Sequence, residues 1–150
     1  MASILTDLTR TVIAGVILTA VLFIIYYVTQ GYSAGDFGPF FFRWLHVLSG
    51  VMWIGLLWYF NFVQIPNMGK IPDEQKPAIG KVIAPAALFW FRWGAMATIV
   101  TGLILAWMNG YIGEAIILGL GAVGEGYVAK HTAIGIGMWL GAIMWFNVWF

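Results

Sequence analysis

Four long apolar segments alternate with shorter polar ones along the chain, and they cover about residues 8–28, 39–65, 84–108 and 130–150. About 20 apolar residues cross the hydrocarbon core of a bilayer, so each segment is long enough to form a transmembrane helix. The pattern therefore predicts an all-α integral membrane protein. We expect a single transmembrane domain over residues 1–150, in which the four helices form a bundle.

The residues around these segments predict where the helices begin and end. The turn-rich stretch 31–36 precedes the second span, and Pro66 is expected to close that span. Pro85 suits the first turn of the third helix. The first span lacks the small-residue cleavage site of a signal peptide, so we expect a retained anchor.

The polypeptide between the third and fourth spans contains a further apolar stretch, from Ala115 to Val123, which is interrupted by Gly119 and Gly121. This stretch is too short to cross a membrane. We expect a short interfacial helix there.

Composition agrees with a membrane protein and excludes several other classes. Hydrophobic residues make up 62% of the chain and charged residues only 9%, which is too few charges for a water-soluble surface. The net charge of +1 and the scattered basic residues exclude a nucleic-acid partner. The absence of cysteine excludes disulfides, iron–sulfur clusters, thiolate zinc sites and covalently attached c-type haem.

The distribution of lysines predicts an orientation. Lys70, Lys76 and Lys81 follow the second span, whereas the loops expected on the opposite side of the membrane carry only Lys130. Basic loops stay on the cytoplasmic side, so both termini are expected in the cytoplasm of a bacterial cell, with the protein in the inner membrane.

The chain has two histidines, His46 and His131, each near the start of a long apolar segment. In the predicted topology the second and fourth spans run in the same direction, so both histidines lie in the outer part of the membrane. A neutral imidazole is a good iron ligand, and an ionisable residue at membrane depth indicates a functional site. We predict that both histidines bind one b-type haem; the alternative is that each donates a structural hydrogen bond to a backbone carbonyl.

Residues near the histidines add to the predicted site. Gly50 and Gly135 each lie one helical turn beyond a histidine, where the absence of a side chain would leave room for a flat macrocycle. Trp53 lies near the centre of its span and is expected to fill the core or line the cofactor. Two imidazole ligands leave no open position on iron, which favours electron transfer over oxygen chemistry.

An internal repeat relates the second and fourth spans. Residues 52–61 and 138–147 share the pattern M-W-x-G and the pair F-N at a constant offset of 86. Repeats of this kind are expected to place a site between the two helices. His46 precedes its repeat methionine by six residues and His131 by seven, so a shared ligand would require the two helices to be rotated unequally.

Two arginines lie within the predicted spans. Arg43 is three residues before His46, where it could pair with a haem propionate or reach a lipid phosphate. Arg92 lies deeper and could contact an anion, a quinone oxygen or the neighbouring tryptophans. The third span also carries a stripe of small residues, which we assign to helix packing: Gly94, Thr98, Gly102 and Ala106.

Two segments resemble a known family. Residues 42–55, with R-W-L-H-x-x-x-G, and residues 137–150, with M-W-F-N-x-W-F, are similar to the membrane domain of the bacterial membrane-bound urate oxidase family. The resemblance covers roughly residues 40–150. In that family the membrane domain is followed by a c-type cytochrome domain. The resemblance thus implies a membrane module that passes electrons into a respiratory chain, with His46 and His131 as the matching histidines.

Three functional hypotheses follow. The first is a b-type haem-binding electron-transfer subunit of a larger respiratory or oxidoreductase complex, whose partners are other membrane subunits and a periplasmic c-type cytochrome. The second is a cofactor-free scaffold subunit of a large membrane complex. The third is a membrane protein that binds a purine anion at Arg43 and Arg92.

Overall fold

The structure is a computed structural model that describes residues 6–31, 33–122 and 129–150. Four of the described helical segments are long and apolar enough to cross a membrane: Leu8–Gln30, Gly35–Met68, Lys76–Met108 and Ala129–Trp149. A short helix lies between the third and fourth. The predicted all-α fold of a multi-pass membrane protein is therefore confirmed. The chain divides into two compact units, Met1–Phe37 and Gly38–Phe150.

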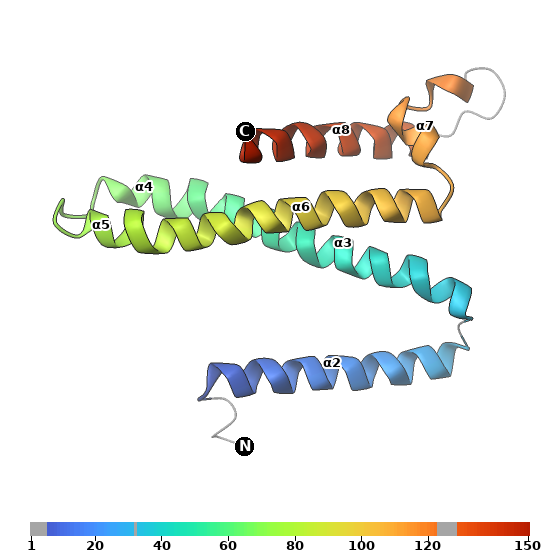
Figure 1. Ribbon diagram of the computed structural model, residues 1–150, viewed down its shortest axis with the longest axis horizontal. Coiled ribbons are helices and arrows are strands. Elements are labelled where there is room, and N and C mark those ends of the chain that lie inside the picture. The colour runs from blue at the N-terminus through green and yellow to red at the C-terminus, as the bar shows by residue number, and fades with distance from the viewer. Residues whose placement is uncertain (1–5, 32, 123–128) are drawn as a thin grey trace. The chain divides into compact units, whose positions relative to one another are not determined.

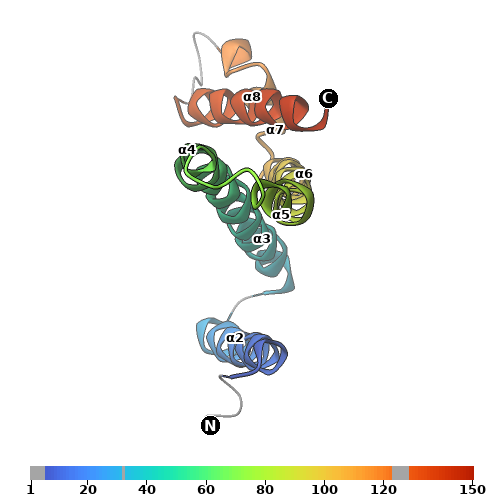
Figure 2. The ribbon, with the colours of Figure 1, turned by 90° about the vertical axis from the view of Figure 1, so that its left-hand side faces the viewer.

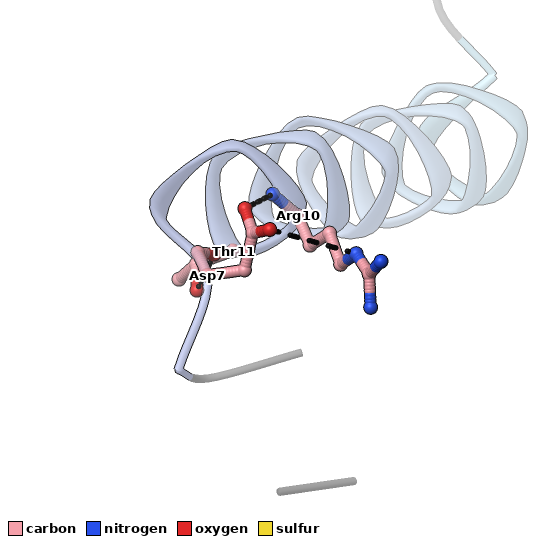
Figure 3. A network of polar contacts seen from close by, with 3 residues as sticks. All are labelled: Asp7, Arg10 and Thr11. Carbon is pink, nitrogen blue, oxygen red and sulfur yellow. Dashed lines mark hydrogen bonds and ion pairs between the residues drawn. The ribbon is translucent and has the colours of Figure 1, made fainter. Parts of the chain in front are cut away.

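The first unit contains helix α2 (Leu8–Gln30), which is capped at both ends. Asp7 accepts a hydrogen bond from the backbone N–H of Arg10 at 3.1 Å, and its carbonyl accepts one from the hydroxyl of Thr11 at 2.9 Å (Figure 3). Gly31 ends the helix with a left-handed φ of 65°, which glycine adopts without steric cost. The helix has no buried residue, as befits a span that exposes apolar side chains all round.

The second and third spans extend beyond the boundaries that the prolines suggest. Helix α3 (Ala34–Trp58) continues through a π-helical segment, Tyr59–Gln64, into α4 (Ile65–Met68). On the return, α5 (Lys76–Ala78) continues through a second π-helical segment, Ile79–Ile83, into α6 (Ala84–Met108). The expectation that Pro66 closes the second span therefore gave a helix that was too short, whereas α6 begins at Ala84 with Pro85 in its first turn, as predicted.

The hydrogen bonding explains why the prolines do not break these helices. The N–H of Ile65 donates to the carbonyl of Phe60, five residues back, and the wider turn accommodates the missing N–H of the adjacent proline. Asparagine side chains also bind carbonyls here, because Asn61 Nδ2 donates to the Leu57 carbonyl at 2.8 Å and Asn67 Nδ2 to the Val63 carbonyl at 2.7 Å. The backbone stays helical past Pro66.

Helices α3 and α6 approach each other closely at glycines. A Cβ atom added to Gly94 on α6 would lie 3.5 Å from the backbone nitrogen of Trp53 on α3. At this level Trp53, Phe91 and Ala95 form a buried cluster, and Trp145 and Val148 pack against it. The stripe of small residues on α6 thus packs against α3, as predicted.

Helix α8 (Ala129–Trp149) packs against α6 and carries the short helix α7 (Ile112–Ile116) on its first turns. The backbone after α7 closes with hydrogen bonds from Leu118 N–H to Ala115 and from Gly119 N–H to Glu114, the pattern of a Schellman motif. Two α8 side chains donate to carbonyls that this end leaves open: Thr132 to Leu118 at 2.9 Å and Trp139 to Ile116 at 2.9 Å. The predicted short helix is confirmed; Val123, at the end of the predicted stretch, lies outside the described residues.

The three long helices of the second unit do not lie parallel throughout. α8 lies along α6, whereas α3 crosses α6 obliquely and diverges from α8 toward its own N-terminal end (Figures 1 and 2). The continuous helix from α3 through α4, which we call the α3–α4 rod, lies nearer to α8 at its α4 end (Figures 1 and 2). The residues that line a cavity between α3, α6 and α8 include His46, and we call this space the wedge.

Gly135 on α8 allows α7 to pack closely, so we predict that Gly135→Ala destabilises the second unit. Its added Cβ would clash with the backbone carbonyl of Ala115, which cannot move without α7. Overpacking of this kind costs roughly 1–3 kcal/mol. The free energy of unfolding in mixed detergent micelles measures the loss.

The matched control is Gly137→Ala, two residues further along the same helix. No atom lies within 4 Å of a Cβ at Gly137, so this substitution should be neutral or stabilising by up to about 1 kcal/mol. Equal stabilities for the two variants would contradict the close contact between α7 and α8.

Candidate functional site

A cavity of about 480 Å³ occupies the wedge between α3, α6, α7 and α8. This volume is in the range of roughly 300–1,000 Å³ that small-molecule and cofactor sites occupy. The walls are predominantly apolar. Three of the lining residues are glycines and contribute no side chain to the walls: Gly102, Gly137 and Gly141. Six of the lining side chains carry a nitrogen, oxygen or sulfur atom: His46, Trp53, Thr98, Tyr111, Met138 and Trp139.

His46 is held against α6 by a hydrogen bond across the helix pair. Its Nδ1 lies 3.0 Å from the carbonyl oxygen of Thr98 and 3.4 Å from the hydroxyl of Thr101. A carbonyl oxygen only accepts, so Nδ1 carries a proton, and in the neutral form of the ring the lone pair is on Nε2. The sequence thus identified a cavity residue in His46, whose imidazole is oriented by α6.

The imidazole of His46 fits where α6 has no side chain. A Cβ at Gly102 would lie 2.8 Å from Cε1 of His46 and 3.1 Å from Nδ1, but 3.8 Å from Nε2. Nε2 is therefore the ring nitrogen farther from this point of α6, and no hydrogen-bond partner for it occurs among the described residues. The arrangement resembles that of metal-binding histidines, in which one ring nitrogen donates to a carbonyl and the other keeps its lone pair.

His131 lies in a different setting. Its ring stacks on that of Tyr111, with centroids 5.7 Å apart and planes inclined by 24°, and Lys130 Nζ lies 5.8 Å from the centroid of the same tyrosine. Tyr111 lines the cavity, but His131 is not among the described residues that do so. The structure therefore brings His131 to the edge of the site through Tyr111.

The other predicted residues divide between the cavity and its surroundings. Trp53 lines the cavity and is buried, and its indole N–H has no acceptor among the described residues. Gly50 packs near Thr98, whose Cγ2 is 3.9 Å from a Cβ built there, and Gly135 packs against α7. Arg43 and Arg92 are both exposed and lie outside the cavity lining.

Three contributors were not singled out from the sequence as site residues: the Thr98 carbonyl, Gly102 and Tyr111. Thr98 and Gly102 belong to the small-residue stripe of the third span, and their position on one face with His46 opposite was the available signal. Tyr111 lies in the connection to α7 and gave no periodic signal.

The donors at this site do not form a conventional cage for a bare metal ion. In the described part of the chain, no group of three or more histidine, cysteine, aspartate or glutamate side chains could hold an ion. A cofactor that brings most of its own metal ligands needs only one or two from the protein. An imidazole at an apolar cavity suits a ligand of that kind.

Comparisons of this chain with models of protein families, with curated proteins and with solved structures find no match. The resemblance to the urate oxidase membrane domain therefore stays a prediction.

We predict that Gly102→Ala displaces the imidazole of His46. The new methyl group would lie 2.8 Å from Cε1 of that ring, so the ring must move away from α6 and lose the Thr98 carbonyl. Nitrogen-detected NMR of the histidine ring should show a changed Nδ1 resonance and tautomer balance, with an unfolding cost of roughly 1–3 kcal/mol.

Gly55→Ala is the corresponding control on α3, because a Cβ at Gly55 meets no atom within 4 Å. Its histidine resonances should match those of the parent protein. Unchanged ring resonances in the Gly102→Ala protein would show that His46 does not lie against Gly102.

Proposed function

We propose that this protein is an integral-membrane electron-transfer subunit that binds b-type haem in the cavity, with His46 as an axial ligand. The observation that carries the proposal is the hydrogen bond between His46 Nδ1 and the Thr98 carbonyl, 3.0 Å long. It fixes the proton on Nδ1 and leaves the Nε2 lone pair for iron. It also raises the basicity of the ligating nitrogen and restricts rotation of the ring.

The cavity fits a porphyrin in three respects. Its volume of about 480 Å³ lies within the range of roughly 300–1,000 Å³ that cofactor sites occupy, and its walls are mostly apolar. The macrocycle brings four nitrogen ligands, so the shortage of further ligating side chains is no obstacle. Gly102, Gly137 and Gly141 line the wedge without side chains, where a flat ring needs space between helices.

Charged groups are available for the propionates. Arg43 lies one helical turn before His46 on α3 and is exposed, and Lys130 lies against Tyr111 at the cavity edge. A guanidinium can bind a carboxylate in bidentate fashion, and an ammonium acts as a point charge. Both groups would then be oriented toward the outer surface of the membrane.

A bound haem would supply a one-electron redox centre. The chain's own residues would hold it at a fixed depth, exclude water with apolar side chains, and tune its potential through the His46 hydrogen bond. The described residues that line the cavity include no cysteine, serine, lysine or carboxylate, so partner subunits would supply the substrate site. An outer-face haem would suit transfer to a periplasmic c-type cytochrome, in line with the resemblance to the urate oxidase membrane domain.

The proposed location follows from the charge distribution. Lys70, Lys76 and Lys81 lie at or near the turn between α4 and α5, which would face the cytoplasm of a bacterial cell if the positive-inside rule applies. The protein would then lie in the inner membrane with both termini in the cytoplasm. His46, near the opposite end of α3, would lie in the periplasmic leaflet.

The proposal is tested by a reduced-minus-oxidised spectrum of the full chain purified from haem-replete cells. The parent protein should show a b-type haem band, and His46→Ala should lose it because the cavity offers no other imidazole. Added imidazole should restore the band in this variant, since the small ligand can occupy the space that the side chain vacates.

Leu48→Ala is the control, because Leu48 is exposed on α3 two residues from His46 and outside the cavity lining. It should keep the band at full intensity. A parent protein that folds but binds no haem would sink the proposal and favour the cofactor-free scaffold, for which His46→Ala would impair assembly alone.

A further inference from the structure

Few side chains at the cavity could provide a second iron ligand opposite His46. The Trp139 indole donates to the Ile116 carbonyl and has no lone pair to offer, and the Thr98 hydroxyl donates to the Gly94 carbonyl at 2.8 Å. The Tyr111 ring stacks on the ring of His131 and makes a cation–π contact with Lys130. Met138 also lines the cavity, and its thioether sulfur is an established type of haem ligand.

The register between helices places Met138 at the depth of His46. On one side of α6, His46 meets Thr98 and Gly102. Helix α8 also packs against α6. A Cβ built on Gly141 of α8 would lie 3.8 Å from Cδ1 of Ile99 on α6. Because α8 runs antiparallel to α6, the residues of α8 level with Gly102 are those about one turn before Gly141, which include Met138.

A second set of contacts gives the same register. Trp53 belongs to the cluster of three buried residues against which Trp145 packs, so Trp145 on α8 lies near the depth of this cluster. His46 lies seven residues before Trp53, and Met138 lies seven residues before Trp145. Two helical turns outward from the shared level, α3 therefore carries an imidazole and α8 a thioether.

His131 fails this comparison of depths. It lies seven residues before Met138, roughly 10 Å further along α8 toward the outer end of that helix. Its ring is stacked on Tyr111. A ligand plane that meets His46 would thus meet α8 near Met138 rather than near His131.

We infer that Met138 is the second axial ligand of the haem proposed above, opposite His46, and that His131 is a residue of the site's outer edge. This inference rests on the proposed function. Methionine and histidine together raise the reduction potential relative to two histidines, because the soft thioether favours the reduced iron.

The test uses the purified full chain, and haem content is measured first. Ferric haem bound by histidine and methionine is low-spin and shows a weak long-wavelength band from sulfur-to-iron charge transfer. Met138→Leu should abolish that band and convert the haem to a high-spin form while leaving its content within about twofold, because leucine conserves the volume of methionine. His131→Ala should leave the band and the spin state unchanged.

Two further variants make the outcome decisive. Met144→Leu, on the exposed side of α8 and outside the cavity lining, should behave like the parent protein. Met138→His should keep the haem low-spin and shift its midpoint potential downward, which provides a readout if the leucine variant fails to fold.

The results separate the two proposals. A parent protein without haem overturns the proposed function and the ligand assignment together. Haem that stays low-spin in Met138→Leu, or a potential that does not fall in Met138→His, overturns the assignment of Met138 alone. Conversion to high-spin haem in His131→Ala would overturn the assignment of Met138 and identify His131 as the second ligand.

Discussion

The hydrogen bond between His46 and the Thr98 carbonyl connects the architecture of the second unit to its chemistry. The bond exists because α3 and α6 approach closely enough for an imidazole to lie across the backbone of the neighbouring helix. That approach depends on Gly94 and Gly102, at which α6 presents backbone instead of side chain. In a bilayer the close fit matters more than in water, because helices gain nothing from burying apolar surface that lipid would cover equally well.

The same principle operates where α7 packs on α8, just beyond the C-terminal end of α6. Gly135 lets α7 lie on α8, and the side chains of Thr132 and Trp139 then donate to carbonyls that the short helix leaves open. Unpaired carbonyls are costly at membrane depth, so α8 satisfies part of the polar requirement of its neighbour. α7 thereby becomes a fixed wall of the cavity instead of a loose surface helix.

Hydrophobic periodicity and length were sufficient to predict the four spans, because a bilayer demands long apolar helices. The local signal failed at Pro66, since π-helical hydrogen bonding tolerates a proline that an α-helix would not. His46 was identifiable because an intramembrane imidazole is unusual. Its contacts with Thr98 and Gly102 could not be predicted from the sequence. They depend on the depth at which α3 and α6 meet, and helix packing sets that depth instead of any local sequence signal.

The internal repeat illustrates this limit. By sequence, Trp53 corresponds to Trp139, yet Trp53 is buried in the cluster whereas Trp139 is half exposed and binds α7. The residue that packs at the level of Trp53 is Trp145. Equivalent positions of the two repeat segments thus have different environments.

The length of the α3–α4 rod has a consequence for the membrane itself. The segment Gly35–Met68 contains 34 residues, and as a continuous helix it spans about 50 Å, against a hydrocarbon core of about 30 Å. Such a rod tilts or projects, and the degree of tilt follows bilayer thickness. α3 crosses α6 obliquely and forms one wall of the wedge, so lipid chain length becomes a variable that acts on the width of the His46 site.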